Sequence, residues 1–280
     1  MNILVTGGSG YLGTPLRSRL GAADLSRRSG FDILDESDLE MVRDYDCVIH
    51  LAALLDKSPE AAEDVFRTNV DGTINVLKKV RKDASFIFAS TKDVYGPFAD
   101  NFREVPESCP TLYAGQSALE WSKLIAERYV EYYGGVREFR TCIFRMSTVY
   151  APLTEGNVPN FVGHYAEAIN TGEPIALPGG GSPRRDLLHV DDLAEACRAF
   201  VDSIIKRGLY NVGGGAANAV SLNELITLME EVSGLQAVLN NNTTIEAPRP
   251  LNYVSDLTLI TQELGWMPKI GLSEGLKTLF

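Results

Sequence analysis

Two kinds of hydrophobic pattern alternate along the first half of the chain. Short runs of consecutive apolar residues predict strands that are buried on both faces of a sheet. These runs cover residues 2–6, 46–53, 84–90 and 141–149, with a weaker strand at 22–26. Between the strands, apolar residues recur at helical spacing over residues 10–20, 60–80 and 118–133. Strands that alternate with helices of this length predict βαβ units, and therefore an α/β fold with a doubly wound parallel sheet.

The pattern changes after residue 150. Residues 151–184 are rich in Pro, Gly and Asn. The remaining predicted elements are helices at about 158–171, 191–206 and 222–233 and a short strand at 208–212. We therefore predict a large first domain and a smaller C-terminal α+β lobe. The first comprises residues 1–150 with about 186–212, and the second comprises residues 151–185 and 213–280.

Composition limits the partners that we expect. With 280 residues, of which 45% are hydrophobic, the chain is long enough to bury a large core. Its net charge of −11 disfavours binding to nucleic acid and to anionic membranes. The start of the chain leads directly into a predicted strand and not into a signal peptide, and nowhere do 18 consecutive apolar residues occur. Four cysteines without a CxxC pair predict a reduced, cytoplasmic protein, and three scattered histidines predict no metal site.

Three glycines lie between the first predicted strand and the first predicted helix. They are Gly7, Gly10 and Gly13, in a Gly-x-x-Gly-x-x-Gly pattern. Such glycines allow a tight turn and let the backbone approach a pyrophosphate at the helix N-terminus. The position of the pattern, between a strand and a helix, therefore predicts a Rossmann fold that binds a dinucleotide cofactor.

The end of the second strand predicts which dinucleotide is bound. An acidic residue there binds the ribose hydroxyls of NAD, whereas an arginine accommodates the 2′-phosphate of NADP. If the strand ends at Ser26, the following Arg27 and Arg28 favour NADP. If the strand is shorter, Asp24 serves NAD instead, and the two arginines are solvated surface charges. We expect NADP, with NAD as the alternative.

The chain resembles the extended short-chain dehydrogenase/reductase family, whose members are nucleotide-sugar epimerases, dehydratases and reductases. The segments that carry this resemblance occur in family order from one end of the chain to the other. They are TGGSGYLG at 6–13, FDILD at 31–35, CVIHLAA at 47–53, NVDGTINVL at 69–77, FIFASTKDVYG at 86–96, SKLIAER at 122–128, RRDLLHVDDLAEA at 184–196 and LGWMP at 264–268. Together these segments are specific for the family, and they are far less specific for a substrate.

The resemblance implies further cofactor contacts. Tyr11 and Leu12 belong to the glycine turn, and Asp32 and Ile33 would contact the adenine. The other implied contacts are Leu51, Ala52 and Ala53, beside the nicotinamide ribose, and Asn69, which would support the helix beneath the active site. A local capping role for the aspartate and core packing for the alanines are the structural alternatives.

Catalysis in this family rests on Ser or Thr together with a Tyr-x-x-x-Lys pair. The lysine binds the ribose and lowers the pKa of the tyrosine, which exchanges a proton with the sugar while hydride moves to or from the nicotinamide. By resemblance Thr91 is the hydroxyl residue and Lys123 is the lysine. The tyrosine position, four residues before Lys123, holds Leu119. Leucine has no proton to exchange.

Three interpretations of Leu119 remain open. Tyr113 reaches into the site from the preceding loop, and this is our first expectation. Alternatively, Lys92 or Asp93 exchanges the proton; an Asp-Glu pair occupies these positions in the family's 4,6-dehydratases, so the change argues against that dehydration. The third interpretation is a cofactor-binding protein without catalysis, such as a sensor or a partner subunit.

The resemblance also implies how a nucleotide sugar is bound. Arg185 and Arg249 match the two arginines that bind its diphosphate, because a guanidinium donates paired hydrogen bonds to phosphate oxygens. An ion pair of Arg185 with a neighbouring aspartate is the alternative. Asn157 and Val158 would lie near the nucleotide base. The resemblance further implies a homodimer, formed through the helices at 60–80 and 118–133. We thus expect an NAD(P)-dependent epimerase or reductase of nucleoside-diphosphate sugars with a non-standard proton donor.

Overall fold

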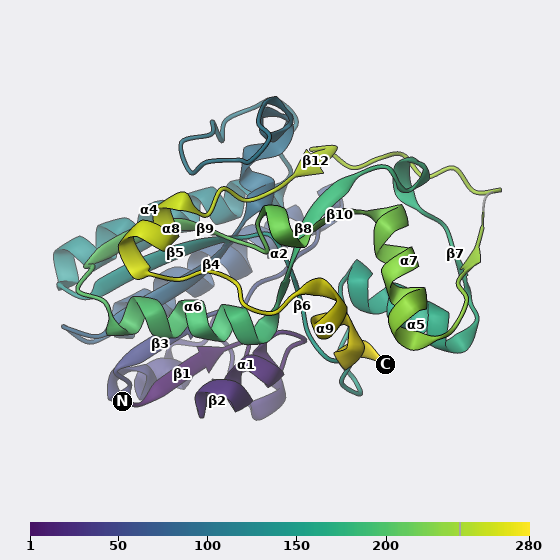
Figure 1. Cartoon of the computed structure of the whole chain (residues 1–280). Coiled ribbons are helices and arrows are strands. Elements are labelled where there is room, and N and C mark those ends of the chain that lie inside the picture. The colour runs from purple at the N-terminus through teal and green to yellow at the C-terminus, as the bar shows by residue number, and fades with distance from the viewer. Residues whose placement is uncertain (241) are drawn as a thin grey trace.

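The large sheet of the protein is parallel throughout. In the computed structural model, which describes residues 1–240 and 242–280, its strands are Ile3–Thr6 (β1), Ala23–Leu25 (β2), Cys47–His50 (β3), Ser85–Thr91 (β4), Arg140–Met146 (β5) and Arg207–Val212 (β9). Their order in space is β2-β1-β3-β4-β5-β9 (Figure 1). The chain winds outward from β1 to β2 and then continues on the other side of β1 with β3. The crevice for a ligand in such a sheet lies at this reversal, beyond the carboxyl ends of the strands.

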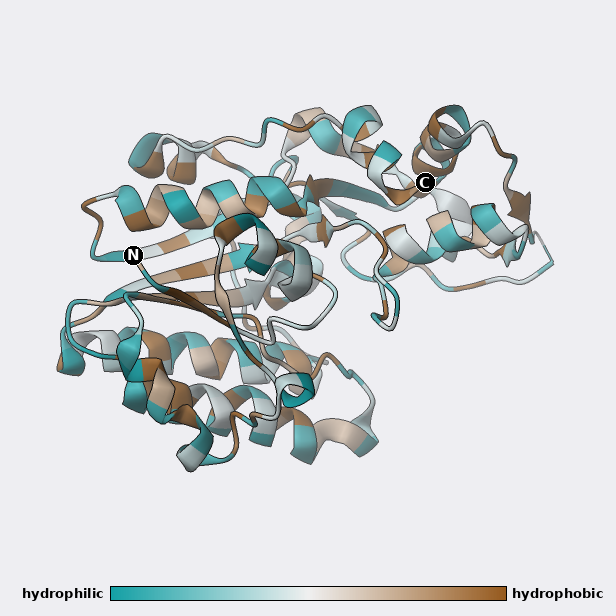
Figure 2. Ribbon diagram, turned by 90° about the horizontal axis from the view of Figure 1, so that it is seen from below, coloured by the Kyte–Doolittle hydropathy of each residue, from teal (hydrophilic) through white to brown (hydrophobic). Residues whose placement is uncertain are grey.

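Helices cover both faces of this sheet. Gly13–Leu20 (α1) and Val190–Asp202 (α6) lie on one face, and Gly72–Lys79 (α3) and Ala118–Arg137 (α4) lie on the other. Strand side chains point to the two faces alternately, so Ile3 and Val5 enter the α1/α6 core whereas Leu4 enters the α3/α4 core. Figure 2 shows the apolar strands between helices whose outer faces are polar. The predicted doubly wound α/β fold is confirmed.

A second set of elements lies beside the carboxyl ends of the large sheet, on the right in Figure 1. Its strands are Thr148–Tyr150 (β6), Pro174–Ile175 (β7), Arg184–His189 (β8), Ala219–Ser221 (β10), Val238–Leu239 (β11) and Asn252–Tyr253 (β12). Its helices are Phe161–Thr171 (α5), Leu222–Ser233 (α7) and Leu272–Leu276 (α9), which share a core. A further helix, Thr258–Leu264 (α8), instead places Ile260 in the core of the large sheet, together with Trp266. These two residues depart from the predicted division, which assigned all of residues 213–280 to the second lobe.

The predicted helix over residues 60–80 is interrupted. Ala62–Phe66 (α2) is followed by a π-helical turn, Arg67–Asp71, and then by α3. The turn contains Asn69, which is buried and hydrogen-bonded to groups outside the helix. Insertions of this kind change the direction of one side chain without ending the helix.

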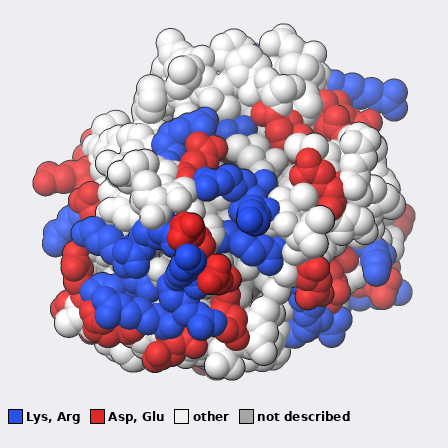
Figure 3. Space-filling view, turned by 90° about the vertical axis from the view of Figure 1, so that its left-hand side faces the viewer, with Lys and Arg blue, Asp and Glu red and all other residues white. Residues whose placement is uncertain are grey.

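The surface carries both signs of charge. The face at the left-hand side of Figure 1 mixes Lys and Arg with Asp and Glu side chains (Figure 3). Exposed ion pairs such as Lys82–Glu138 contribute little stability, because water and salt screen them. Among the described residues, no helix is long and apolar enough to cross a membrane.

Candidate active site

The glycine turn is built by contacts that exclude side chains. Gly7 has a φ of +70°, and a Cβ there would lie 2.9 Å from the backbone nitrogen of Ala52. A Cβ on Gly13 would lie 2.1 Å from the carbonyl oxygen of Gly7. Because backbone atoms surround both positions, a larger residue cannot be accommodated by a side-chain movement. The turn therefore leaves the N-terminus of α1 open, which fits the diphosphate of a dinucleotide.

Polar groups at the end of β2 are held by one another. The Ser26 hydroxyl lies 2.7 Å from that of Ser9 and donates to Asp24 Oδ2 over 2.9 Å. The other carboxylate oxygen, Oδ1, is buried and has no hydrogen-bond partner in the described part of the chain. Arg27 is exposed, whereas Arg28 donates to the carbonyl oxygen of Gly156 and so contacts the second lobe. The two predicted NADP-binding arginines therefore have different surroundings.

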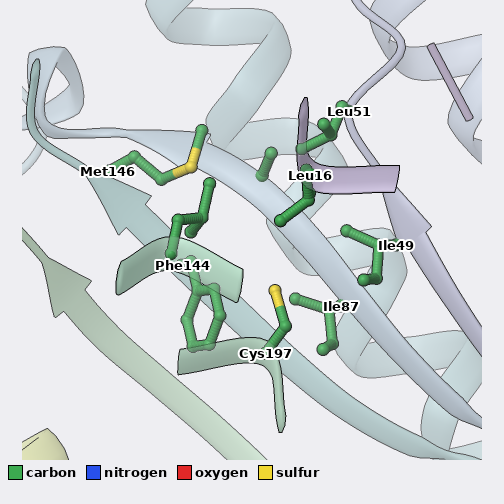
Figure 4. A pocket seen from close by; sticks show the side chains of 9 residues that line it. Leu16, Ile49, Leu51, Ile87, Phe144, Met146 and Cys197 are labelled. Atoms are coloured by element: carbon green, nitrogen blue, oxygen red, sulfur yellow. The ribbon is translucent and has the colours of Figure 1, made fainter. Parts of the chain in front are cut away.

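The loop after β3 is fixed against α4. Asn69 accepts a hydrogen bond from the backbone of Leu54 over 2.8 Å and donates to its carbonyl and to Ser122 Oγ, both over 2.9 Å. These bonds hold the segment that contains Ala52 and Ala53 beside the glycine turn. Leu51 lines a small apolar cavity beneath it, between α1, α6 and the sheet (Figure 4). The floor of the crevice is thus apolar.

Asp32 and Ile33 take structural roles in addition to their predicted one. Asp32 Oδ1 accepts from the backbone of Leu34, which is the local capping role considered as an alternative. The side chain of Ile33 is buried and packs beside Gly72, where a Cβ would lie 2.5 Å from its terminal carbon. Contact of either residue with adenine stays a prediction.

Thr91 is the last residue of β4, and Lys123 reaches the same strand from α4, two residues before Thr91. Lys123 is buried in α4, and its Nζ donates to the carbonyl oxygen of Ala89 over 2.8 Å and lies 4.9 Å from the centre of the Phe88 ring. Burial lowers the pKa of Lys123 to about 8, and the charge of Glu127 opposes this shift. Thr91 Oγ1 accepts from the backbone of Asp93 over 3.1 Å. The structure thus brings the two predicted catalytic residues to one strand end.

Leu119 lies in the first turn of α4, one turn before Lys123. Its side chain is 5% exposed. Ser117 caps this helix, and Glu120 accepts hydrogen bonds from the Ser117 backbone and hydroxyl. The first turn of α4 is therefore fixed, and the helix places a leucine where the family's tyrosine would stand.

Four charged side chains form an ionic cluster at the entrance to this region: Lys57, Lys92, Asp93 and Glu120. Asp93 lies 2.6 Å from Lys92 and 2.7 Å from Lys57, and Lys57 lies 2.8 Å from Glu120. Burial alone would raise the pKa of Asp93, but the two ammonium groups hold it well below its usual value. Asp93 is thus a weak base. The contribution of Lys57 had no signal in the sequence, whereas Ser117-x-x-Glu120 is a visible capping box.

Tyr113 lies against this cluster. Its ring packs on Gly96, where a Cβ would lie 2.2 Å from a ring carbon, and its hydroxyl donates to the carbonyl oxygen of Asp93 over 3.4 Å. Burial, reinforced by the charge of Glu120, raises the pKa of Tyr113 to about 12. The phenol is therefore protonated at neutral pH. Its hydroxyl is hydrogen-bonded to Asp93, two residues after Thr91 at the end of β4.

A buried ion pair beneath the site was missed by the sequence reasoning. Glu127 Oε2 lies 2.7 Å from Arg145 Nη2, and Glu127 Oε1 accepts from Arg145 Nε over 3.0 Å and from Ser90 Oγ. Arg145 also donates to the hydroxyl of Tyr95. Because Ser90 precedes Thr91, this pair fixes the strand end that carries the site.

Of the two predicted phosphate-binding arginines, Arg185 contacts the chain segment that begins with Arg249. Arg185 is buried in β8 and donates to the carbonyl oxygens of Arg184, Pro250 and Leu251 over 2.7–2.8 Å. Burial lowers its pKa. These carbonyls take the place of the ion pair considered as an alternative. Arg249 precedes Pro250, is exposed and lies 3.4 Å from Asp100. Arg185 thus lies beside the segment that carries Arg249, 64 positions later in the chain. The guanidinium of Arg249 is exposed on this segment.

Asn157 lies at the cofactor end. Its amide approaches Thr14 Oγ1 over 3.5 Å in the first turn of α1, and its oxygen accepts from Arg28. Val158 is 78% exposed. The predicted contact of both residues with a nucleotide base stays a prediction. Within residues 1–240 and 242–280, no three His, Cys, Asp or Glu side chains gather in a way that suits a metal ion.

The fold and the glycine turn define a dinucleotide-dependent enzyme. Residues 3–213 match the NAD dependent epimerase/dehydratase family, and the chain belongs to this family of enzymes, as its motifs implied. It is similar over its whole length to CDP-paratose 2-epimerase of Salmonella typhi, with 28% identity and 98% of that protein covered. It is 30% identical to a dTDP-glucose 4,6-dehydratase of Streptomyces griseus over 88% of this chain and 74% of that one.

Solved structures give the same result. UDP-glucose 4-epimerase of Thermotoga maritima, in complex with UDP-glucose, is 26% identical, with a TM-score of 0.84 over 100% of this chain and 97% of the other. MoeE5, in complex with UDP-glucuronic acid and NAD, is 26% identical, with a TM-score of 0.85 over 99% and 97%. The family assignment and the NAD dependence of the family are thus established, whereas the preference for NADP stays a prediction.

Proposed function

We propose that this protein is an NAD-dependent epimerase or reductase that acts on a nucleoside-diphosphate sugar. The observation that carries the proposal is the position of Lys123, whose ammonium binds β4 at Ala89, two residues before Thr91, with Arg185 and the 249–251 segment held nearby. Lys92, which follows Thr91, joins the end of β4 to the strands of the second lobe. Its ammonium lies 5.4 Å from the centre of the ring of Tyr253 in β12, which pairs with β8. A diphosphate bound at Arg249, whose side chain is exposed, would place its sugar toward the end of β4, whereas Arg185 holds the segment that carries Arg249.

The cofactor end supports NAD as the dinucleotide. When bound, the nicotinamide supplies or accepts the hydride. Gly7 and Gly13 leave room for the diphosphate, and Asp24 in β2 is an acidic residue of the type that binds ribose hydroxyls at this strand end. Lys123 would orient the ribose on the nicotinamide side.

We further propose that Tyr113 is the proton donor. Its raised pKa suits a group that gives a proton to a developing alkoxide, and its hydroxyl is hydrogen-bonded to the carbonyl oxygen of Asp93, two residues after Thr91. This chemistry favours reduction of a keto sugar over abstraction of a proton. Lys92 is the alternative donor, because it too lies at the end of β4. Asp93, held by two ammonium groups, suits neither role.

The test is single-turnover oxidation of bound NADH in the presence of keto and hydroxyl nucleotide sugars. Tyr113→Phe is expected to slow the step by about 10²–10⁴-fold while NADH affinity is unchanged. Lys92→Met serves as the matched comparison, and a loss confined to this variant would move the role to Lys92. If both variants turn over like the natural protein, neither group is the donor.

Leu119→Tyr tests whether the family's usual arrangement is still supported by its surroundings. A gain of turnover in this variant, when the natural chain binds NADH but transfers no hydride, would favour the cofactor-binding protein without catalysis. Equal turnover of both would support the relocated donor.

We also propose that the protein is a homodimer. Trp121, Tyr129 and Tyr132 are exposed on α4, and large aromatic side chains of this kind favour burial against another protein surface. Sedimentation velocity at micromolar concentration tests this proposal, and a single monomeric species would contradict it.

A further inference from the structure

A loop of the second lobe lies across the cofactor end of the crevice. This loop, residues 151–157, follows β6 and contains a turn in which Asn157 donates its backbone N–H to the carbonyl oxygen of Thr154 over 3.1 Å. At its base, the Tyr11 hydroxyl of the glycine turn donates to the carbonyl of Ala151 and accepts from its N–H, both over 2.9 Å. The base of the 151–157 loop is therefore fixed to the turn that would hold a diphosphate.

The tip of the 151–157 loop is held by one arginine. Arg28 Nη2 donates to the carbonyl oxygen of Gly156 over 2.6 Å, and its Nη1 donates to Asn157 Oδ1. The same Nη1 also donates to the carbonyl oxygen of Ser9 over 3.0 Å. Arg28 thereby joins the glycine turn to the second lobe, and both of its terminal nitrogens are engaged.

This arginine occupies a position that selects between cofactors. It follows β2 by three residues, where the adenosine ribose of a dinucleotide would lie, and an arginine there accommodates a 2′-phosphate. A phosphate that bound end-on would need the two terminal nitrogens that now bind the 151–157 loop and Ser9, because a guanidinium binds phosphate through paired hydrogen bonds. The loop and a 2′-phosphate therefore compete for Arg28.

Resting on the proposed function, we propose that Arg28 is a specificity-determining latch. With NAD bound, Arg28 stays engaged with Gly156 and Asn157, and the 151–157 loop retains the cofactor. With NADP bound, the 2′-phosphate takes the guanidinium, the tip of the loop is released, and the cofactor leaves sooner. Tyr11 and Ala151 are the fixed end about which the tip opens.

The first measurement is the rate at which NADH and NADPH leave the full-length protein, followed by stopped-flow displacement. NADH is expected to leave on the order of tenfold faster from Arg28→Ala than from the natural protein, as the loss of hydrogen bonds to a charged group predicts. Arg28→Lys is expected to resemble Arg28→Ala, because one ammonium cannot replace the planar fork. Arg43→Ala, which removes an equal, exposed charge elsewhere, is expected to have no effect.

The second measurement is hydrogen exchange of residues 151–157, which does not depend on turnover. Exchange is expected to rise in cofactor-free Arg28→Ala, and to rise in the natural protein with saturating NADPH relative to NADH. The latch is refuted if Arg28→Ala releases NADH at the natural rate, or if NADPH protects the loop as well as NADH does. Failure of the natural protein to bind either dinucleotide would instead refute the proposed function, and exchange in the cofactor-free protein would still test the contact.

Discussion

The two ends of the crevice make different demands on the chain. At the glycine turn, Gly7 and Gly13 act through the absence of a side chain, because backbone atoms lie within 2.1–2.9 Å of where a Cβ would be. At the end of β4, the proposed roles of Thr91 and Lys123 depend on the side chains that they carry. A site made of backbone therefore survives changes around it as long as the glycines remain. A site made of side chains is altered by one substitution, as at Leu119.

The ends also differ in their electrostatics. The end of the crevice at β4, here called the reacting end, is surrounded by buried or partly buried charges. They are those of Lys123, the Glu127–Arg145 pair and the ionic cluster of Lys57, Lys92, Asp93 and Glu120. The glycine turn is held mainly by backbone and hydroxyl contacts, and Arg28 beside it is exposed. Loss of one partner from a buried pair leaves an uncompensated charge in a low dielectric. The reacting end should therefore be the more sensitive of the two to single substitutions.

The largest expected effect is that of Glu127→Ala. This change leaves the guanidinium of Arg145 buried without its carboxylate, which is expected to lower the free energy of unfolding by about 3–5 kcal/mol. Urea denaturation measures the loss. Glu40→Ala is the matched control, because Glu40 also forms ion pairs, with Arg43 and Lys79, but its own carboxylate is exposed. Its expected loss is about 1 kcal/mol or less. Equal losses in the two variants would contradict the difference between the ends.

A smaller effect is expected for Gly13→Ala at the cofactor end. The added methyl would lie 2.1 Å from the carbonyl oxygen of Gly7, and shifting this backbone is expected to cost about 1–3 kcal/mol of stability. NADH affinity should fall with it, because the turn that approaches the diphosphate has moved. Calorimetric unfolding and NADH titration measure the two effects. Gly271→Ala, where nothing lies within 4 Å, should change neither.

The last expected effect concerns acid stability at His50. This residue is buried between Thr6 and Thr73, and burial, followed by the charge of Lys123, lowers its pKa from 6.5 to about 3. Below pH 6.5, His50 therefore binds a proton in the unfolded chain but not in the native protein. The contribution of His50 is present above pH 6.5 and is lost at roughly 1.4 kcal/mol per pH unit as the pH falls toward 3.

Urea denaturation between pH 7 and pH 5 tests this slope. His50→Asn should flatten the fall in stability, because asparagine does not titrate. His164→Asn, at an exposed histidine, should leave the fall as it is in the natural protein. An unchanged slope in His50→Asn would show that acid lability has another source.

The sequence predicted the large sheet more accurately than the second lobe. Strands β1, β3, β4 and β5 are apolar runs bounded by helices, so their pattern is visible. By contrast, β6, β10 and β12 have only two or three residues, and β8 begins with Arg184 and Arg185, which do not indicate a buried strand. These strands are held by pairing with one another, which no local pattern reports.

The same limit applies to the site. The glycine turn, Thr91, Lys123 and the position of Leu119 follow from spacing within single segments. The surroundings of Tyr113 and Arg28 did not, because their partners are distant in sequence: Arg28 binds Gly156, and the phenol of Tyr113 lies near Asp93. The interruption of the helix at Asn69 was missed for the same reason, since its partners are Leu54 and Ser122.

The sequence by itself determined the family, the doubly wound fold, the glycine turn and the absence of tyrosine at position 119. Each of these depends on residue type and on spacing along the chain. Only the tertiary structure decided that Arg28 binds the second lobe and that Arg185 binds the segment that carries Arg249. It also decided that the end of β4 is surrounded by buried charges. Hydrogen bonds and burial depend on distances through space. Chain folding sets these distances between residues that the sequence keeps far apart.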